Sequence, residues 1–249
     1  MKTVLITGSS EGIGFALAKT FAAKGYRILL NARNKEKLAE AAAFLNETYK
    51  AQTVCIPLDL TQDHAAEELF RLCKEYPVDV LINNAGSGFT GVSWQQDIQK
   101  EEDMIRLNVI AMMSLSKLFL KEMTERGAGI IINVASTGAF QPGPYIAGYY
   151  ASKAFVLNYT RAIEREAKKQ GVKVYCLCPG PVRTGFYEKG KGHCPSYAMS
   201  PEDVAEYMYD HLGKKRCVVV PGMINRIARI FPSALKTRFV ERKKEKEIR

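Results

Sequence analysis

Residues 3–14 read TVLITGSSEGIG, and this stretch decides the expected fold. A run of strand type, Thr3 to Thr7, leads directly into a turn with glycine at positions 8, 12 and 14, followed by a helical pattern. Glycine lets the backbone of such a turn approach a pyrophosphate, which the amides at the helix N-terminus then bind. The stretch predicts a dinucleotide-binding turn, although a tight turn without a ligand remains the alternative for this motif alone. The predicted contacts are Gly8, Ser9, Ser10, Gly12, Ile13 and Gly14.

The same order of strand and helix repeats along the rest of the chain. Short runs that are apolar throughout, rather than alternating, indicate strands buried on both faces of a parallel sheet. Amphipathic segments separate these runs. We therefore expect an α/β fold of Rossmann type, with a doubly wound, seven-stranded, mostly parallel sheet and helices on both faces. The expected strands are 3–7, 27–31, 53–57, 78–83, 130–134, 172–178 and 217–221.

Charge is distributed unevenly over the 249 residues, whose net charge is +10. From Lys214 to Arg249, twelve basic residues face three glutamates, so residues 1–213 carry a net charge of only +1. A basic tail could touch nucleic acid or anionic lipid. We expect no nucleic-acid partner, because no reading motif accompanies the tail. A solvated helix is the favoured interpretation, and membrane-surface contact is the minority one.

Several classes of protein are disfavoured by composition. No run approaches the roughly 18 to 20 apolar residues that a membrane span needs, and the first apolar stretch is too short for a signal peptide. Six cysteines without paired spacing and three scattered histidines predict reduced thiols and no metal site. We expect a cytoplasmic protein.

Tyr149 and Lys153 form the pattern Y-x-x-x-K. Residues four apart share one face of a helix, and an ammonium beside a phenol lowers the pKa of the phenol. Tyr149 could then exchange a proton near neutral pH. The pattern is weak alone and gains its value from the glycine turn.

The glycine turn also satisfies G-x-S-x-G, which is the nucleophile motif of serine hydrolases, with Ser10 at its centre. That hypothesis needs a downstream acid and then a histidine in a supporting motif, and the chain offers none that is convincing. A serine hydrolase at Ser10 is therefore kept only as a remote alternative. A protein that binds a dinucleotide without turnover is the alternative outside enzymes.

With these motifs in place, the chain resembles the short-chain dehydrogenase/reductase family, in its large branch with T-G-x-x-x-G-x-G and Y-x-x-x-K. Further matches are N-N-A-G, an acidic residue after the third strand, and P-G after the sixth strand with a threonine beyond it. The resemblance covers residues 3 to about 221. The matching positions outside the glycine turn are Asp59, Leu60, Asn83, Asn84, Ala85, Gly86, Asn108, Ser136, Tyr149, Lys153, Pro179, Gly180 and Thr184.

The resemblance implies a role for each catalytic position. Tyr149 would be the general acid that protonates a carbonyl oxygen in reduction, and the base in oxidation. Lys153 would lower the pKa of Tyr149 and bind the nicotinamide ribose, while Ser136 would hold the substrate oxygen. Asn108 would keep a water in line with Lys153 for a proton relay. The implied cofactor contacts outside the glycine turn are Arg33, Asp59, Leu60, Asn84, Ala85, Gly86, Tyr149, Lys153, Pro179, Gly180, Val182 and Thr184.

Cofactor choice depends on the end of the second strand. An enzyme that uses NAD places a carboxylate there to accept the ribose hydroxyls, whereas this chain reads Asn31-Ala32-Arg33. Arg33 offers a planar guanidinium to a 2′-phosphate, and Ser9 or Ser10 could add a hydroxyl. We expect NADP(H) to be preferred, with NAD(H) as the alternative cofactor. The alternative for Arg33 is a solvated loop arginine that binds no cofactor.

We expect residues 1–221 to form one dinucleotide-binding and catalytic domain and residues 222–249 to form a basic helical C-terminal extension. The loop 179–200 is interpreted as a substrate lid. Aromatic side chains near the site favour a bulky hydrophobic ketone or alcohol such as a hydroxysteroid, with 3-oxoacyl or general carbonyl reduction as alternatives. Tyr150 is expected to pack in the core. The aromatic and apolar positions concerned are Phe89, Trp94, Phe140, Tyr145, Phe186, Tyr187 and Met199.

Two expectations concern surfaces. Surplus apolar residues on 101–126 and 149–170 predict a homodimer or a tetramer built from it. Apolar residues at helical spacing in 223–240 predict that the tail folds over the substrate pocket or the dimer edge. The residues taken as surplus are Met112, Met113, Leu115, Phe119, Phe155, Val156 and Tyr159.

Overall fold

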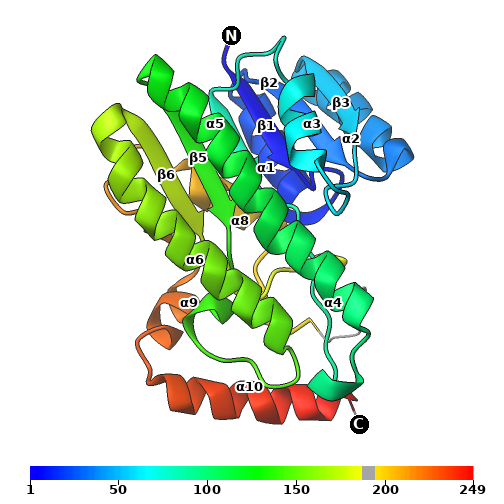
Figure 1. Cartoon of the computed structure of the whole chain (residues 1–249), viewed down its shortest axis with the longest axis vertical. Helices are drawn as coiled ribbons and strands as arrows, with labels where there is room; N and C mark the ends of the chain where they lie inside the picture. Colours follow the sequence, from blue (N-terminus) through cyan, green and yellow to red (C-terminus); the bar gives the residue numbers. More distant parts are fainter. Residues whose placement is uncertain (187–193, 249) are drawn as a thin grey trace.

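The computed structural model describes residues 1–186 and 194–248, and a parallel sheet lies at its centre (Figure 1). Seven strands follow the order β3-β2-β1-β4-β5-β6-β7, and every neighbouring pair is parallel. The expected Rossmann-type sheet is confirmed, and it is parallel throughout. The strands are β1 (Thr3–Thr7), β2 (Arg27–Ala32), β3 (Thr53–Pro57), β4 (Val80–Asn83), β5 (Gly129–Val134), β6 (Val172–Leu177) and β7 (Val218–Val219).

Helices cover both faces of this sheet. In Figure 1, α5 and α6 cross the front of the sheet and α1 and α8 lie behind it. The helices are α1 (Gly12–Ala23), α2 (Lys35–Tyr49), α3 (Ala65–Leu72), α4 (Ile98–Ile105), α5 (Met112–Arg126), α6 (Ala147–Ala167), α8 (Pro201–Tyr209), α9 (Met223–Ala228) and α10 (Ser233–Ile248). Short 3₁₀ turns lie at Ser93–Gln95, Thr137–Phe140 and Lys168–Gln170, and a π-helical turn lies at Arg106–Ala111.

The strands carry apolar residues on both faces of the sheet, and successive side chains enter different cores. In β1, Val4 and Ile6 belong to the core that α1, α2 and α8 cover, whereas Leu5 belongs to the core under α3, α5 and α6. All three are fully buried. A strand with apolar residues on both faces needs a helical layer on each side, and this requirement explains the doubly wound arrangement.

Three strands are shorter than expected. β6 ends at Leu177 rather than 178. β4 begins at Val80 rather than 78, because Asp79 turns its carboxylate to the Thr3 amide, 2.8 Å away. β7 lies at the sheet edge and pairs only through Val218 and Val219 rather than over 217–221. The existence of the strands follows from the pattern, whereas these ends depend on contacts with neighbouring segments.

The apolar residues taken as a surplus for subunit contact are mostly buried within the chain. Met112, Leu115, Phe119 and Val156 are at most 5% exposed, because they pack under α5 and α6 against the sheet. Phe155 remains exposed and stacks on Tyr159 with 5.8 Å between ring centroids. The apolar surface available for a partner is therefore smaller than the sequence indicates.

The tail forms α9 and α10 at one end of the molecule, beyond the carboxyl ends of β5 and β6 (Figure 1). Of the residues in α10, Val240 is the buried one. None of the helices in the described ranges is both long and apolar enough to cross a bilayer.

A buried polar network joins the centre of the sheet to α5 and α6. Asn83 Nδ2 donates to Asn133 Oδ1 at 2.8 Å and to Ser116 Oγ at 3.0 Å. Asn133 Nδ2 in turn donates to Thr160 Oγ1 at 3.1 Å. Buried amides contribute to stability only while their hydrogen bonds are satisfied, so this network holds the strands that carry the site in register with both helices.

Replacing Asn133 by alanine should therefore lower the free energy of unfolding by about 1–3 kcal/mol, because buried partners on Asn83 and Thr160 lose their hydrogen bonds. Urea denaturation followed by circular dichroism measures the change. Asn158→Ala on the exposed face of α6 is the matched control and should stay within about 0.5 kcal/mol of the parent. Equal stability of the two variants would contradict the role given to the network.

Candidate active site

A cavity of about 1390 Å³ runs along the carboxyl ends of the strands. Its walls come from the turn after β1, the ends of β2 to β6, α6 and the tail helices. The order of the sheet reverses between β1 and β4, and in open α/β sheets ligands bind at such a switch point. The cavity is thus where the fold class places a ligand.

The glycine turn is held in a shape that side chains would prevent. Gly8 and Gly12 have φ values of +64° and +58°, which L side chains rarely adopt. A Cβ on Gly14 would lie 2.1 Å from the carbonyl oxygen of Gly8, so only glycine fits there. The turn and the first amides of α1 together form a cradle that suits a pyrophosphate.

The N-N-A-G segment after β4 braces this turn. Asn84 Nδ2 donates to the carbonyl oxygens of Thr7 and Gly8, both at 3.0 Å. Thr7 Oγ1 accepts hydrogen bonds from the amides of Asn84 and Ala85, again at 3.0 Å. Asn84, Ala85 and Gly86 also line the cavity, so the segment both shapes the turn and faces a ligand.

Ser9 does not face the cavity. It is fully buried, and its hydroxyl and amide both donate to the carbonyl oxygen of Asn31. The Ser9 hydroxyl joins β1 to β2, so of the two hydroxyls predicted to reach a 2′-phosphate, that of Ser10 is the one on the cavity wall. Gly14 is likewise absent from the cavity wall and acts through its packing on Gly8. The residues of the turn that do line the cavity are Gly8, Ser10, Glu11, Gly12 and Ile13.

The end of the cavity next to β2 and β3 contains Arg33, Asp59 and Leu60. Asp59 Oδ1 accepts hydrogen bonds from the amide and the hydroxyl of Thr61, both at 2.9 Å, which fixes the loop after β3. Asn31 is buried and donates to the carbonyl oxygens of Ile56 and Leu58. Arg33 is exposed, and within residues 1–186 and 194–248 it makes no hydrogen bond or ion pair. Its guanidinium is available to a ligand.

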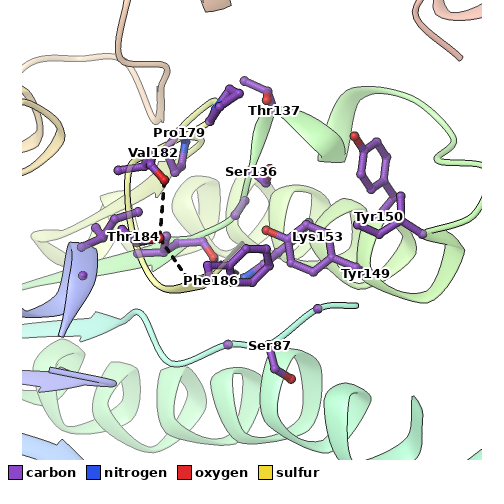
Figure 2. A pocket seen from close by; sticks show the side chains of 18 of the residues that line it. Ser87, Ser136, Thr137, Tyr149, Tyr150, Lys153, Pro179, Val182, Thr184 and Phe186 are labelled. Carbon is purple, nitrogen blue, oxygen red and sulfur yellow. Dashed lines mark hydrogen bonds between the residues drawn. The ribbon is translucent and has the colours of Figure 1, made fainter. Parts of the chain in front are cut away.

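Ser136, Tyr149 and Lys153 meet in the middle of the cavity (Figure 2). Ser136 lies two residues beyond the end of β5 and caps the following 3₁₀ turn, its Oγ accepting from the Gly138 amide at 3.1 Å. Tyr149 and Lys153 lie one turn apart on α6, with Lys153 Nζ 5.7 Å from the centroid of the Tyr149 ring. Lys153 Nζ also donates to the carbonyl oxygen of Val134 at 2.9 Å. Three residues from two elements therefore face one space.

Burial controls the protonation of this cluster. It raises the pKa of Tyr149 to about 12, although a hydrogen bond with the Ser136 side chain acts in the opposite direction. It also lowers the pKa of Lys153 to about 8. Burial thus raises the pKa of Tyr149 above its ordinary value, and the lowering by Lys153 that the sequence led us to expect stays a prediction. At neutral pH Tyr149 is a neutral phenol, which suits a proton donor.

Asn108 lies in the π-helical turn between α4 and α5. Its Nδ2 donates to the carbonyl oxygen of Ser87 at 2.8 Å and to Ser152 Oγ at 3.0 Å, and its Oδ1 accepts from the Ser87 amide at 2.9 Å. Ser152 Oγ then donates to the carbonyl oxygen of Tyr149. Both amide protons of Asn108 are engaged, so its side chain ties the N-N-A-G loop to α6. The expectation that Asn108 keeps a relay water in line with Lys153 stays a prediction.

The segment after β6 closes the cavity from the other side. Pro179, Gly180, Val182 and Thr184 line it, and the Thr137 amide donates to the carbonyl oxygen of Pro179 at 2.8 Å. Figure 2 shows Thr184 hydrogen-bonded to Val182 and to the Phe186 amide. Of the interpreted lid at 179–200, residues 187–193 lie outside the described residues.

The aromatic positions divide into two groups. Phe89, Phe140 and Phe186 line the cavity, whereas Trp94 is 85% exposed outside it and Tyr145 borders a separate small pocket. Met199 packs on the core, and Tyr187 lies outside the described residues. Tyr150, expected to pack in the core, lines the cavity as well, with its ring against Gly138 and Gly143.

The tail supplies the part of the cavity that the motifs do not identify. α9 and α10 line it with apolar and basic side chains, and a Cβ on Gly180 would collide with Asn225. The apolar spacing of the tail predicted contact with the substrate pocket or the dimer edge, and the structure places these apolar side chains on the cavity wall. No motif marked Arg229 and Lys236 as cavity residues, because a basic run resembles a solvated helix.

Two alternatives, a metal site and a serine hydrolase, lack the arrangement of side chains that they need among the described residues. No group of three metal-binding side chains comes together in residues 1–186 and 194–248. A serine nucleophile on a strand-to-helix turn occupies a strained conformation, and Ser10 is absent from the described non-glycine residues with positive φ. His211, one of the histidines that a hydrolase could use, stacks on Tyr207 in α8.

Comparison with known proteins agrees with this geometry. A model of the short chain dehydrogenase family matches residues 2–192. The chain is 32% identical over 210 residues to an uncharacterized oxidoreductase of Staphylococcus saprophyticus, covering 82% of this chain and 88% of that protein.

Two solved structures extend the similarity to the whole fold. A short-chain dehydrogenase from Sphingobium yanoikuyae in complex with NADPH superposes with a TM-score of 0.86 at 28% identity, covering 100% of this chain and 97% of that one. A 7β-hydroxysteroid dehydrogenase superposes with a TM-score of 0.88 at 26% identity, covering 96% of each chain. With the glycine cradle and the Ser136, Tyr149 and Lys153 cluster in one cavity, the chain belongs to the short-chain dehydrogenase/reductase family of oxidoreductases, which act on alcohols and ketones.

Proposed function

We propose that the protein is an NADP(H)-dependent oxidoreductase that interconverts a ketone or aldehyde and an alcohol on a bulky hydrophobic substrate. The observation that carries this proposal is the cluster of Ser136, Tyr149 and Lys153 in the cavity that the glycine turn borders. Gly8, Gly12 and Asn84 would hold the pyrophosphate end of the cofactor. The nicotinamide, when bound, supplies or accepts the hydride.

In reduction, Tyr149 donates its phenolic proton to the carbonyl oxygen. Its pKa of about 12 keeps the phenol protonated at neutral pH, so it is ready to act as a general acid. Ser136 Oγ lies within hydrogen-bonding reach of that phenol, and its hydroxyl donates a hydrogen bond to the same carbonyl oxygen of the substrate. Oxidation reverses these transfers, with Tyr149 receiving the proton of the alcohol.

Lys153 stabilises the phenolate that forms when Tyr149 gives up its proton. The pKa of the ammonium, about 8, keeps it mostly charged at neutral pH, and its Nζ lies 5.7 Å from the tyrosine ring. A charge in a desolvated site acts more strongly than in water. The hydrogen bond to the carbonyl oxygen of Val134 fixes this charge in place.

Replacement of Tyr149 by phenylalanine should lower kcat for ketone reduction by about 10²–10⁴-fold, which is the contribution of a general acid. The assay follows the absorbance of the reduced nicotinamide with a panel of ketones. Tyr150→Phe makes the same chemical change one residue away, and it should keep kcat within about threefold, because Tyr150 is no part of the proton transfer. Equal losses in both variants would contradict the assignment of Tyr149.

The preference for NADP(H) rests on Arg33. No carboxylate stands at the end of β2 to bind a ribose diol, since Asn31 is buried there, whereas Arg33 is exposed at the wall of the cavity. Guanidinium groups bind phosphates through paired hydrogen bonds. The related Sphingobium enzyme is in complex with NADPH, which supports the same choice here.

Changing Arg33 to aspartate should reverse the preference. Charge-assisted contacts contribute about 1.5–3 kcal/mol, so the parent should favour NADPH over NADH by about tenfold to a hundredfold in kcat/KM. The Arg33→Asp variant should no longer favour NADPH over NADH in kcat/KM, whereas Arg71→Asp on the surface of α3 should keep the preference of the parent. If the parent enzyme prefers NADH, Arg33 does not bind a 2′-phosphate as proposed.

A hydrophobic substrate is supported by the walls of the cavity. Phe89, Phe140 and Phe186 line the same cavity as Tyr149, and Phe186 lies 5.4 Å from the Tyr149 ring, centroid to centroid. Pockets of this composition bind large apolar bodies. The structural relative that acts on a 7β-hydroxysteroid agrees with a substrate of that size.

We also propose a homodimer or a tetramer built from it, through α5 and α6. Phe155, 39% exposed and stacked on Tyr159, is the apolar group that such a contact would cover. Light scattering should give a mass at least twice that of one chain, and Phe155→Glu should yield monomer. A parent that is monomeric at micromolar concentration would contradict this assembly.

A further inference from the structure

The end of the cavity formed by the tail is apolar but largely uncovered. Its side chains remain between 52% and 65% exposed, although they line a cavity rather than a flat surface. Exposed apolar groups of this number in one place mark a binding surface. They are Ile224, Ile227, Phe231, Leu235 and Phe239.

Basic groups lie among these apolar side chains. Arg229, Lys236, Lys243 and Lys244 line the tail end of the cavity. The carboxylates of the described cavity wall are Glu11, Asp59 and Asp103, which come from the glycine turn, the loop after β3 and α4. The tail end is therefore positively charged.

Three of these four cations, Arg229, Lys236 and Lys243, are not neutralised by an ion pair with any described residue. Lys244 forms an ion pair with Glu247 at 2.5 Å. Burial and the neighbouring Arg229 guanidinium both lower the pKa of Lys236, which shows two cations held close together. An anion bound between them would relieve this repulsion.

Both cations are anchored to the segment that carries Ser136. Lys236 Nζ donates to the carbonyl oxygen of Phe140 at 3.3 Å, and the Arg229 guanidinium lies 5.4 Å from the centroid of the Phe140 ring. Phe140 ends the 3₁₀ turn that Ser136 caps. The cationic pair thus lies one short turn from the residue that holds the reacting oxygen.

We propose that the substrate is an amphipathic ketone or alcohol with an anionic group, a carboxylate or a phosphate, that Arg229 and Lys236 bind. Its apolar body lies on α9 and α10, and its carbonyl reaches Ser136 and Tyr149. This inference rests on the proposed function and identifies the substrate class of the same site. A guanidinium and an ammonium on one anion make charge-assisted hydrogen bonds, which are stronger than neutral ones.

Binding is measured first, because it does not depend on turnover. Dodecanoate, dodecyl phosphate and dodecanol share one apolar chain, and calorimetry with the full-length protein gives their Kd values. We expect at least one of the two anions to bind tenfold or more tightly than dodecanol, and the better anion identifies the head group. Equal Kd values for all three compounds would overturn the proposal.

Activity is then compared on matched substrates. Each linear oxo fatty acid, in a series of increasing length, is compared with its own methyl ester, which carries no negative charge. Oxoalkyl phosphates test the second head group. With NADPH, kcat/KM should favour an anionic substrate over its neutral partner by at least tenfold. Arg229→Gln and Lys236→Met should reduce that preference, because kcat/KM should fall further for the anionic substrate than for its neutral ester.

Controls separate charge at the site from charge on the tail. Arg242→Gln and Lys246→Met remove exposed cations of α10 that do not line the cavity, so the anion preference should persist in both. Lys236→Arg should retain it as well. A preference that falls equally in the Arg242 and Lys246 variants would show long-range attraction and overturn the assignment to Arg229 and Lys236.

The two proposals fail in different ways. Reduction of neutral ketones without any anion preference would remove the anion site and leave the proposed function intact. Anion binding that depends on Arg229, with no reduction of any ketone or oxidation of any alcohol, would remove the proposed function and leave the anion site.

Discussion

The close contact between Gly14 and the carbonyl oxygen of Gly8 constrains much of the molecule. A methyl group on Gly14 would lie 2.1 Å from that oxygen, so the first turn of α1 can approach the end of β1 only in the absence of a side chain. Asn84 then bonds to both Thr7 and Gly8 from the end of β4. Because Gly14 has no side chain, the turn and the N-N-A-G loop can pack together at the switch point of the sheet.

The site that grows from this constraint depends on burial for its chemistry. Loss of hydration moves the pKa of Tyr149 up to about 12 and that of Lys153 down to about 8. Both shifts favour neutral forms, yet at pH 7 each group keeps the proton that reduction requires of it. The geometry is kept by bonds that use no reacting atom, since Asn108 and Ser152 join the Ser87 loop to the backbone of Tyr149.

The two ends of the cavity have different characters. The end near β2 and β3 presents Arg33 beside fixed loops, while the end near the tail presents apolar side chains with cations between them. The tail touches the catalytic segment at Phe140 and Gly180. Changes in the tail can therefore alter which substrate enters while leaving the glycine turn and the catalytic cluster as they are.

The sequence alone determined the features that depend on local spacing. The parallel sheet follows from runs of apolar residues, the cradle from glycines at positions 8, 12 and 14, and the shared helix face of Tyr149 and Lys153 from their separation. Each is a property of a few consecutive residues. The resemblance to a known family added Ser136 and Asn108, which no local pattern marks.

Only the tertiary structure decided the features that depend on distant neighbours. Ser9 lies inside because its hydroxyl meets the carbonyl oxygen of Asn31 across the sheet, and Met112 and Phe119 are covered because α5 packs on the sheet. The pKa of Tyr149 rises because surrounding segments exclude water. The sequence indicates that Arg229 and Lys236 are surface charges, whereas the structure places both of them against Phe140. Burial and contact between segments far apart in the chain are not encoded in spacing, so the character of the substrate end was decided by packing.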